Sequence, residues 1–207
     1  MGTIRLTMGQ AVIRYLAAQK ARIDGALQPL VPAVWSIFGH GNVAGLGEAL
    51  YQQRAVLPTL RAHNEQAMTL AAIAFAKQKR RRQFMACPTS IGPGATNMVT
   101  AAAVAHANRL PVLLLPSDAF ATRGPDPVLQ QIENFNDPNV TANDCFKPVS
   151  RYWDRINRPE QLLTSLPRAL QVLTDPADCG PVSLCMPQDV QTMAYDYPES
   201  FFQERVH

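Results

Sequence analysis

Short apolar runs alternate along the chain with segments in which apolar residues recur three and four positions apart. The short runs indicate buried strands, and they lie at residues 34–38, 83–87, 111–116 and 181–186. Two weaker runs, at residues 57–61 and 150–156, indicate a shorter strand and an edge strand. Helical spacing lies between these strands, at residues 7–20, 45–52, 65–76, 95–108 and 157–174.

This alternation predicts an α/β domain with a doubly wound, mainly parallel sheet flanked by helices. Residues 21–33 contain one glycine and two prolines and are expected to form a loop. Residues 117–148 are rich in Pro, Asp, Asn and Gly and predict a long excursion with one brief helix, at residues 128–133. Pro167 is expected to kink the last helix or split it in two.

The composition bears on the size of the core and on the kind of partner. With 47% hydrophobic residues, a chain of 207 residues can bury the core of one α/β domain. Its 19 basic and 16 acidic residues leave a net charge of +3, too small and too dispersed to indicate nucleic acid or a membrane surface as the main partner. The basic cluster at residues 77–82 either closes a helix C-terminus or forms a nucleic-acid patch, and the first use is the commoner.

The four cysteines and the N-terminus bear on the cellular compartment. Cys87, Cys145, Cys179 and Cys185 form no Cys-x-x-Cys pair and have no histidine at ligand spacing, so we expect reduced, mostly buried thiols. The sequence has no signal-peptide pattern and no apolar run of membrane-spanning length. A cytoplasmic protein is expected.

The most informative polar residue is Glu65, at the expected junction between a short strand and an Ala-rich helix. Ligands of open α/β sheets collect at such junctions, because strand carboxyl ends and helix amino ends converge there. A glutamate in the first turn also complements the helix dipole, and position alone favours this simpler use. Both uses remain open at this point.

Two glycine-rich turns accompany this junction. Residues 39–42 (Gly-His-Gly-Asn) follow the first buried strand, and residues 92–97 (Gly-Pro-Gly-Ala-Thr-Asn) open a later helix. Neither turn has the G-x-G-x-x-G pattern of dinucleotide-binding sites or the G-K-S/T of a P-loop. They either bind another kind of ligand or serve only as tight turns.

Together, the two glycine turns and residues 63–66 (His-Asn-Glu-Gln) resemble the pyrimidine-binding domain of thiamine-diphosphate enzymes such as acetolactate synthase. Residues 187–191 (Pro-Gln-Asp-Val-Gln) are also similar to that family. Within the family, five longer stretches resemble the trihydroxycyclohexanedione hydrolases of myo-inositol catabolism, and they lie at residues 39–43, 61–68, 71–83, 126–133 and 150–162. The resemblance covers nearly the whole chain.

The resemblance implies a catalytic role for Glu65, whose carboxylate would bind a ring nitrogen of the cofactor's aminopyrimidine and so promote activation of the thiazolium carbon. A carboxylate is needed because it can share a proton with that nitrogen, whereas Gln cannot transfer one. The resemblance also implies that His40 lies near the reacting centre as a second catalytic candidate, and a purely structural role in the turn stays equally open. Further cofactor-binding residues match the family turn along the pyrimidine, namely Gly92, Pro93, Gly94 and Asn97.

The family also implies what this chain lacks. Its members bind the diphosphate through magnesium on a separate domain with a Gly-Asp-Gly motif, which does not occur here, so no metal ligand is expected in this chain. We therefore expect a pyrimidine-binding domain at residues 1–190 and, at residues 191–207, a tail or linker toward a missing central domain. The closing residues favour a piece excised from a longer, homo-oligomeric enzyme, inactive alone, whose site faces the diphosphate-binding domain of a neighbouring subunit.

The resemblance favours a hydrolase that opens the ring of a cyclic dione substrate, trihydroxycyclohexane-1,2-dione, to 5-deoxy-glucuronate. The same domain of an acetolactate synthase or a 2-keto-acid decarboxylase is the nearest alternative. A non-catalytic binding protein with this fold is a third, which the presence of Glu65 disfavours.

Overall fold

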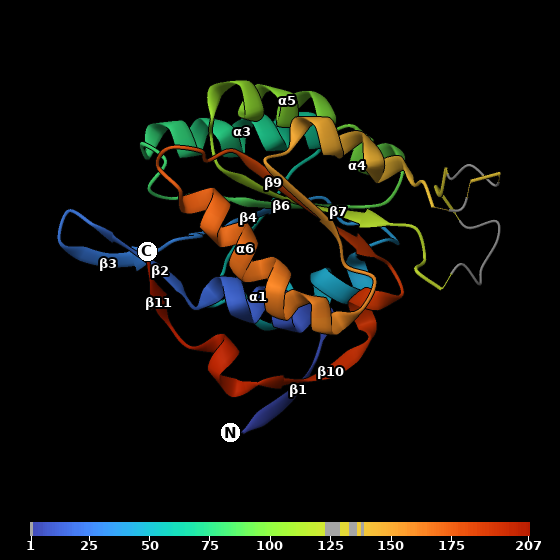
Figure 1. Ribbon diagram of the computed structural model, residues 1–207, viewed down its shortest axis with the longest axis horizontal. Helices are drawn as coiled ribbons and strands as arrows, with labels where there is room; N and C mark the ends of the chain where they lie inside the picture. The colour runs from blue at the N-terminus through green and yellow to red at the C-terminus, as the bar shows by residue number, and fades with distance from the viewer. Residues whose placement is uncertain (1, 123–128, 133–135, 138) are drawn as a thin grey trace.

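The computed structural model describes residues 2–122, 129–132, 136–137 and 139–207, and its centre is a six-stranded sheet (Figure 1). The strand order is β5-β4-β6-β7-β9-β8, and every neighbouring pair is parallel. The predicted doubly wound, parallel α/β fold is confirmed. The strands are β4 (Val34–Ser36), β5 (Thr59–Arg61), β6 (Ala86–Thr89), β7 (Val112–Asp118), β8 (Tyr152–Arg155) and β9 (Pro181–Pro187).

Helices cover both faces of the sheet and enclose two separate cores (Figure 1). Against one face lie α1 (Met8–Ala17), the π-helical turn η1 (Val43–Gly47), α2 (Glu48–Gln52) and α6 (Leu162–Thr174). Against the other lie α3 (Glu65–Gln78), α4 (Pro93–Thr96), α5 (Val99–Asn108) and the 3₁₀ helix η2 (Ala142–Val149). Because both faces are covered, β7 and β9 are buried along their whole length, as their apolar sequences predicted.

The segment predicted as a loop at residues 21–33 instead contains a β-hairpin. Strands β2 (Gln19–Ile23) and β3 (Ala26–Pro29) pair antiparallel, so α1 ends at Ala17 rather than near residue 20. Asp24 and Gly25 both have positive φ, at 50° and 84°, as a two-residue hairpin turn requires. The Asp-Gly pair was therefore a hairpin signal that the glycine and proline count obscured.

Residues 191–207 do not extend away as a tail. After the 3₁₀ turn η4 (Val190–Thr192), β10 (Ala194–Pro198) pairs antiparallel with β1 (Thr3–Thr7), and β11 (Arg205–Val206) pairs parallel with β2. Between them, Phe201 in η5 (Glu199–Phe202) stacks on Tyr15 of α1 with ring centroids 4.6 Å apart. Burial of these aromatic rings holds the segment against the domain, whereas its polar residues had suggested a linker.

Two further expectations concern helices. In the brief helix expected at residues 128–133, the two end residues lie outside the described residues, and residues 129–132 form a turn and irregular chain rather than a helix. Pro167 does not split α6, which follows the 3₁₀ turn η3 (Pro159–Gln161) and runs on without interruption. Leu166, Ala169 and Leu170 are fully buried beside Pro167, so packing outweighs its local cost of about 3 kcal/mol.

The four cysteines are free thiols, as expected, and three of them are buried, namely Cys87, Cys179 and Cys185. Within the described ranges, no helix combines the length and the apolar character that crossing a membrane would need.

Candidate functional site

Glu65 is the first residue of α3, but it is not the residue that caps this helix. The N-cap is Asn64, whose side-chain oxygen accepts a hydrogen bond from the amide of Ala67 at 2.9 Å. The main-chain oxygen of Glu65 accepts from the hydroxyl of Thr69 at 2.8 Å, which fixes the first turn. Capping is thus provided by Asn64, and the carboxylate of Glu65 is left for other contacts.

The carboxylate of Glu65 faces the start of the second glycine turn. Asn97 donates from Nδ2 to Glu65 Oε2 at 2.8 Å. The other oxygen, Oε1, lies beside Gly94, and a Cβ added at Gly94 would stand 3.2 Å from it. The absence of a side chain at Gly94 therefore leaves room next to Oε1.

A cavity of about 610 Å³ opens at this point. It brings together four of the residues expected from the sequence, Glu65, Pro93, Gly94 and Asn97. The remaining lining residues come from the ends of β4 and β6, from α4 and from the long excursion after β7, and they are Ile37, Phe38, Gly39, Ser90, Thr96 and Gln130. The cavity lies at the carboxyl edge of the sheet, where ligands of this architecture bind.

Gly92 does not line the cavity, but its conformation shapes the turn. Its φ is +63°, and an added Cβ would lie 1.9 Å from the main-chain oxygen of Gln130. Only glycine fits both conditions. Gly92 therefore allows the chain around Gln130 to pack directly on the turn that carries Gly94.

His40 also stands apart from the cavity lining, although its neighbour Gly39 belongs to it. The turn is held by Asn42, whose Oδ1 accepts from the Gly39 amide at 2.9 Å and whose Nδ2 donates to the Ile37 carbonyl at 3.0 Å. The His40 ring is half-buried, and its Nε2 is buried without a hydrogen-bond partner among the described residues. A buried ring nitrogen in this state has an unused hydrogen-bonding capacity.

The sequence did not single out Ser90, which lines the cavity between Gly39 and Gly94. The residue is 7% exposed, and its hydroxyl has no hydrogen-bond partner in the described part of the chain. A Cβ added at Gly39 would lie 2.5 Å from Ser90 Oγ, so the two segments are in close contact. The available signal was the polar pair at residues 89–90, which lies at the end of a buried strand and precedes a glycine turn.

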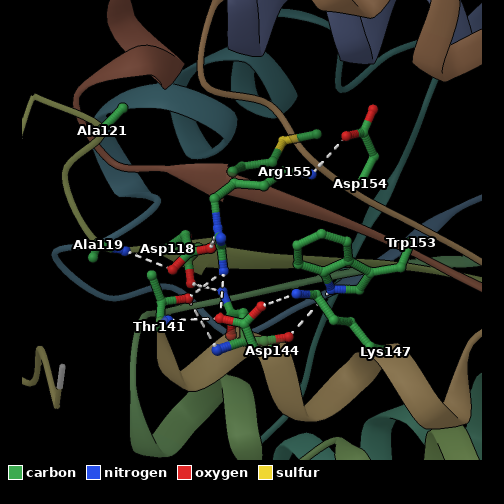
Figure 2. A network of polar contacts seen from close by, with 12 residues as sticks. Asp118, Ala119, Ala121, Thr141, Asp144, Lys147, Trp153, Asp154 and Arg155 are labelled. Carbon is green, nitrogen blue, oxygen red and sulfur yellow. Dashed lines mark hydrogen bonds and ion pairs between the residues drawn. The ribbon is translucent and has the colours of Figure 1, made fainter. Parts of the chain in front are cut away.

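A second polar cluster, also missed, lies at the carboxyl ends of β7 and β8 (Figure 2). Arg155 donates from Nε to Asp118 at 2.8 Å, and from Nη2 to Thr141 at 2.7 Å and Asp144 at 3.0 Å. The side chain of Asp118 is only 2% exposed and that of Arg155 17%. Arg155 thus ties the end of β7 to the start of η2, the two ends of the long excursion that contributes Gln130 to the cavity.

The charges in this cluster stabilise one another. Burial by itself raises the pKa of Asp144, but hydrogen bonds from Lys147, the Thr141 amide and Arg155 outweigh it and hold that pKa below its usual value. Burial by itself lowers the pKa of Arg155, and the charge of Asp118 outweighs it and raises that pKa. Arg155 also lies 5.0 Å from the centre of the Trp153 ring, which adds a cation–π contact. Asp144 and Arg155 therefore stabilise each other's charged forms.

Metal ligands were not expected in this chain. Among the residues that the structure describes, no three His, Cys, Asp or Glu side chains converge in a way that could hold a metal ion. The expected magnesium ligands on another domain stay a prediction.

Comparison with known proteins gives the family. Residues 30–136 match the thiamine pyrophosphate enzyme N-terminal TPP binding domain. Relatives named 3D-(3,5/4)-trihydroxycyclohexane-1,2-dione hydrolase, from Bacillus cereus (strain AH820) and Bacillus anthracis (strain A0248), are 56% identical to this chain, and one from Bacillus thuringiensis (strain Al Hakam) is 55% identical.

Each of these matches covers 100% of this chain and 32% of the relative, so the chain spans about a third of the length of the curated relatives it matches. The matched family segment contains the first glycine turn, the start of α3 and the second glycine turn, which together form the cavity around Glu65. This chain belongs to the thiamine pyrophosphate enzyme family, as its N-terminal, cofactor-binding domain.

Proposed function

We propose that this chain is the pyrimidine-binding domain of a thiamine-diphosphate-dependent hydrolase that opens the ring of trihydroxycyclohexane-1,2-dione to 5-deoxy-glucuronate in myo-inositol degradation. The observation that carries the proposal is the oxygen Oε1 of Glu65, which has no hydrogen-bond partner among the described residues and lies beside Gly94 in the lining of the cavity. The substrate is inferred from the printed name of relatives that are 56% identical over the whole chain.

The residues around the cavity fit the aminopyrimidine end of the cofactor. A flat heterocycle needs a narrow space with an acceptor at its edge, and Gly94 keeps such a space open next to Glu65. Pro93 and Phe38 add apolar surface to the walls. Thiamine diphosphate supplies a thiazolium carbon that attacks a carbonyl group and then accepts its electrons.

Within the site, each residue has a separate task. Glu65 would hold a proton between Oε1 and a ring nitrogen of the pyrimidine, which Gln could not do. Gly94, Pro93 and Asn97 would form the surface along the ring, with Gly92 setting the turn that carries them. His40, with its unpartnered Nε2, would bind oxygen atoms of the cyclic dione or move a proton to them.

The rest of the active site would come from elsewhere. The diphosphate and its magnesium ion would bind to another domain, contributed by a neighbouring subunit of a cytoplasmic homo-oligomer. This part of the proposal rests on the family alone. A Gly-Asp-Gly motif with downstream Asn residues elsewhere in the full-length enzyme or in a partner chain would support it.

The test uses the full-length enzyme with the cyclic dione and with pyruvate as separate substrates. We expect 5-deoxy-glucuronate from the dione and no carbon dioxide from pyruvate. Glu65→Gln should abolish turnover, whereas Glu48→Gln, which changes the exposed first-turn glutamate of α2, should leave it unchanged. Turnover of pyruvate would favour the synthase or decarboxylase alternative. Absence of cofactor-dependent turnover with either substrate would favour the non-catalytic alternative.

A further inference from the structure

Asn97 contacts Glu65 rather than only lining the cavity. Its amide nitrogen Nδ2 lies 2.8 Å from Glu65 Oε2, on the side of the carboxylate away from Gly94. Only the amide nitrogen can face a carboxylate oxygen, because both groups would otherwise be acceptors. The two oxygens of Glu65 therefore have different surroundings, one bound within the protein and one next to an open space.

The backbone of Asn97 is held in place by its helix. Its amide donates to the carbonyl of Pro93 at 3.1 Å, and the neighbouring Met98 is fully buried in the core between α3, α5 and the sheet. Glu65 is held equally well by the first turn of α3. Asn97 is the C-cap of α4 and Glu65 the first residue of α3, so both ends of the hydrogen bond are anchored at helix termini.

The kind of donor matters for the chemistry. Among the described residues, Glu65 has no ion-pair partner, so its negative charge is not neutralised by Arg or Lys. The neutral amide of Asn97 orients the carboxylate without placing a positive charge beside it. A guanidinium at the same position would instead hold the carboxylate in its ionised form and oppose proton transfer.

We propose that Asn97 is a positioning residue that binds Oε2 of Glu65 and thereby directs Oε1 at the pyrimidine ring of the cofactor. The inference rests on the proposed function, since it concerns the same carboxylate. It gives Asn97 a second task besides its place in the surface along the ring. The ligand would contact Glu65 directly, and Asn97 would set the direction of that contact.

Two near-isosteric variants of the full-length enzyme test this role. Asn97→Leu removes the donor, and we expect exchange of the thiazolium proton of bound thiamine diphosphate, followed by NMR, to slow by about ten- to hundredfold. In Asn97→Asp two carboxylates face each other, and they can share a proton only as the pH falls. The exchange rate of Asn97→Asp should therefore recover between pH 8 and pH 6, whereas that of Asn97→Leu should not.

The matched control is Asn108→Asp, on the exposed surface of α5, where the side-chain amide donates to the Val104 carbonyl. In this variant the thiazolium proton should exchange at the wild-type rate at every pH. Wild-type rates of thiazolium proton exchange in both Asn97 variants would overturn the inference. Slow exchange in Asn97→Asp that does not change with pH would also overturn it. If Glu65→Gln also exchanged at the wild-type rate, the proposed function itself would fail. Normal exchange in the Asn97 variants with none in Glu65→Gln would remove only the positioning role.

Discussion

The side-chain nitrogen of Gln191 donates to the main-chain oxygen of Gly41 at 2.8 Å, although the two residues are 150 positions apart. The same nitrogen lies 3.0 Å from the Met186 carbonyl, and the side-chain oxygen accepts from the amide of Leu46 at 3.3 Å. Gln191 is 1% exposed. One buried amide thus joins the first glycine turn, η1 and the end of β9.

Replacing this amide should destabilise the domain. Gln191→Leu keeps the volume but leaves buried main-chain groups without partners, so we expect a loss of about 2–3 kcal/mol in the free energy of unfolding. Urea unfolding followed by circular dichroism measures it. Gln203→Leu, at an exposed position, is the control and should change stability little. Equal stability of both variants would contradict the assigned role.

The cluster around Arg155 predicts a second loss of stability. Arg155→Met leaves the buried carboxylate of Asp118 without its partner, which should cost about 3–5 kcal/mol. Arg158→Met is the matched control, because Arg158 pairs with Glu160 at a side chain that is 76% exposed. Chemical denaturation measures the free energy of unfolding of both variants. A small loss in Arg155→Met would show that the fold does not depend on the buried pair.

The lowered pKa of Asp144 predicts a pH dependence of stability. An aspartate with a lowered pKa in the folded state stabilises the protein fully above the pKa of the unfolded chain, about 3.9, and this contribution is lost as the pH falls through the folded value. The stability difference between wild type and Asp144→Asn should therefore be constant above about pH 5 and shrink below about pH 4.

Urea titrations from pH 3 to pH 7 check this expectation. Asp196→Asn, at an exposed pair with Arg5, serves as the control for a surface aspartate. If the difference for Asp144→Asn stayed constant down to pH 3, the ion pairs of Asp144 would not contribute to stability.

Gly94 predicts an effect on ligand binding without an effect on folding. Gly94→Ala would place a methyl group 3.2 Å from Glu65 Oε1, where the cofactor ring is proposed to bind. We expect the affinity of the full-length enzyme for thiamine diphosphate to fall by about tenfold. Isothermal titration measures the affinity. Unchanged affinity, with the melting temperature also unchanged, would mean that the ring does not approach this oxygen.

Thiol reactivity offers a test of burial in the native chain. Burial raises the pKa of the Cys87 thiol, and Cys179 and Cys185 are also buried, whereas Cys145 is partly exposed. One thiol should therefore react with Ellman's reagent at pH 8 before unfolding and four after it. Fast reaction of more than one thiol in the native protein would contradict this packing.

The hydrophobic pattern was sufficient to predict the strands of the sheet and its main helices, because buried strands and amphipathic helices leave a local signal in the sequence. Tyr197 and Phe201 were not recognised as core residues, since their segment has no apolar period and they are buried through long-range contacts such as the pairing with β1 and the packing on α1. Long-range pairing of this kind leaves no periodic pattern of hydrophobic residues in the local sequence.

The candidate site also contains residues that the local sequence marks and residues that it does not. Glu65 and the turn at Gly94 are marked by their own neighbours in the sequence, at a helix start and a glycine turn. The contact of Asn97 with Glu65 and that of Arg155 with Asp118 depend on which helices and strands become neighbours. Strand β9 lies between β7 and β8, an order that the linear sequence does not state. These residues could be found only once the sheet order was known.

The pairing of β1 with β10 has a consequence during protein synthesis. Arg5 and Asp196, which form a salt bridge across this pair, are 191 positions apart. At about 5–20 residues per second, the ribosome adds the partner strand some 10–40 seconds after β1 has been made. One edge of β1 and one edge of β2 therefore stay unpaired until β10 and β11 have been made.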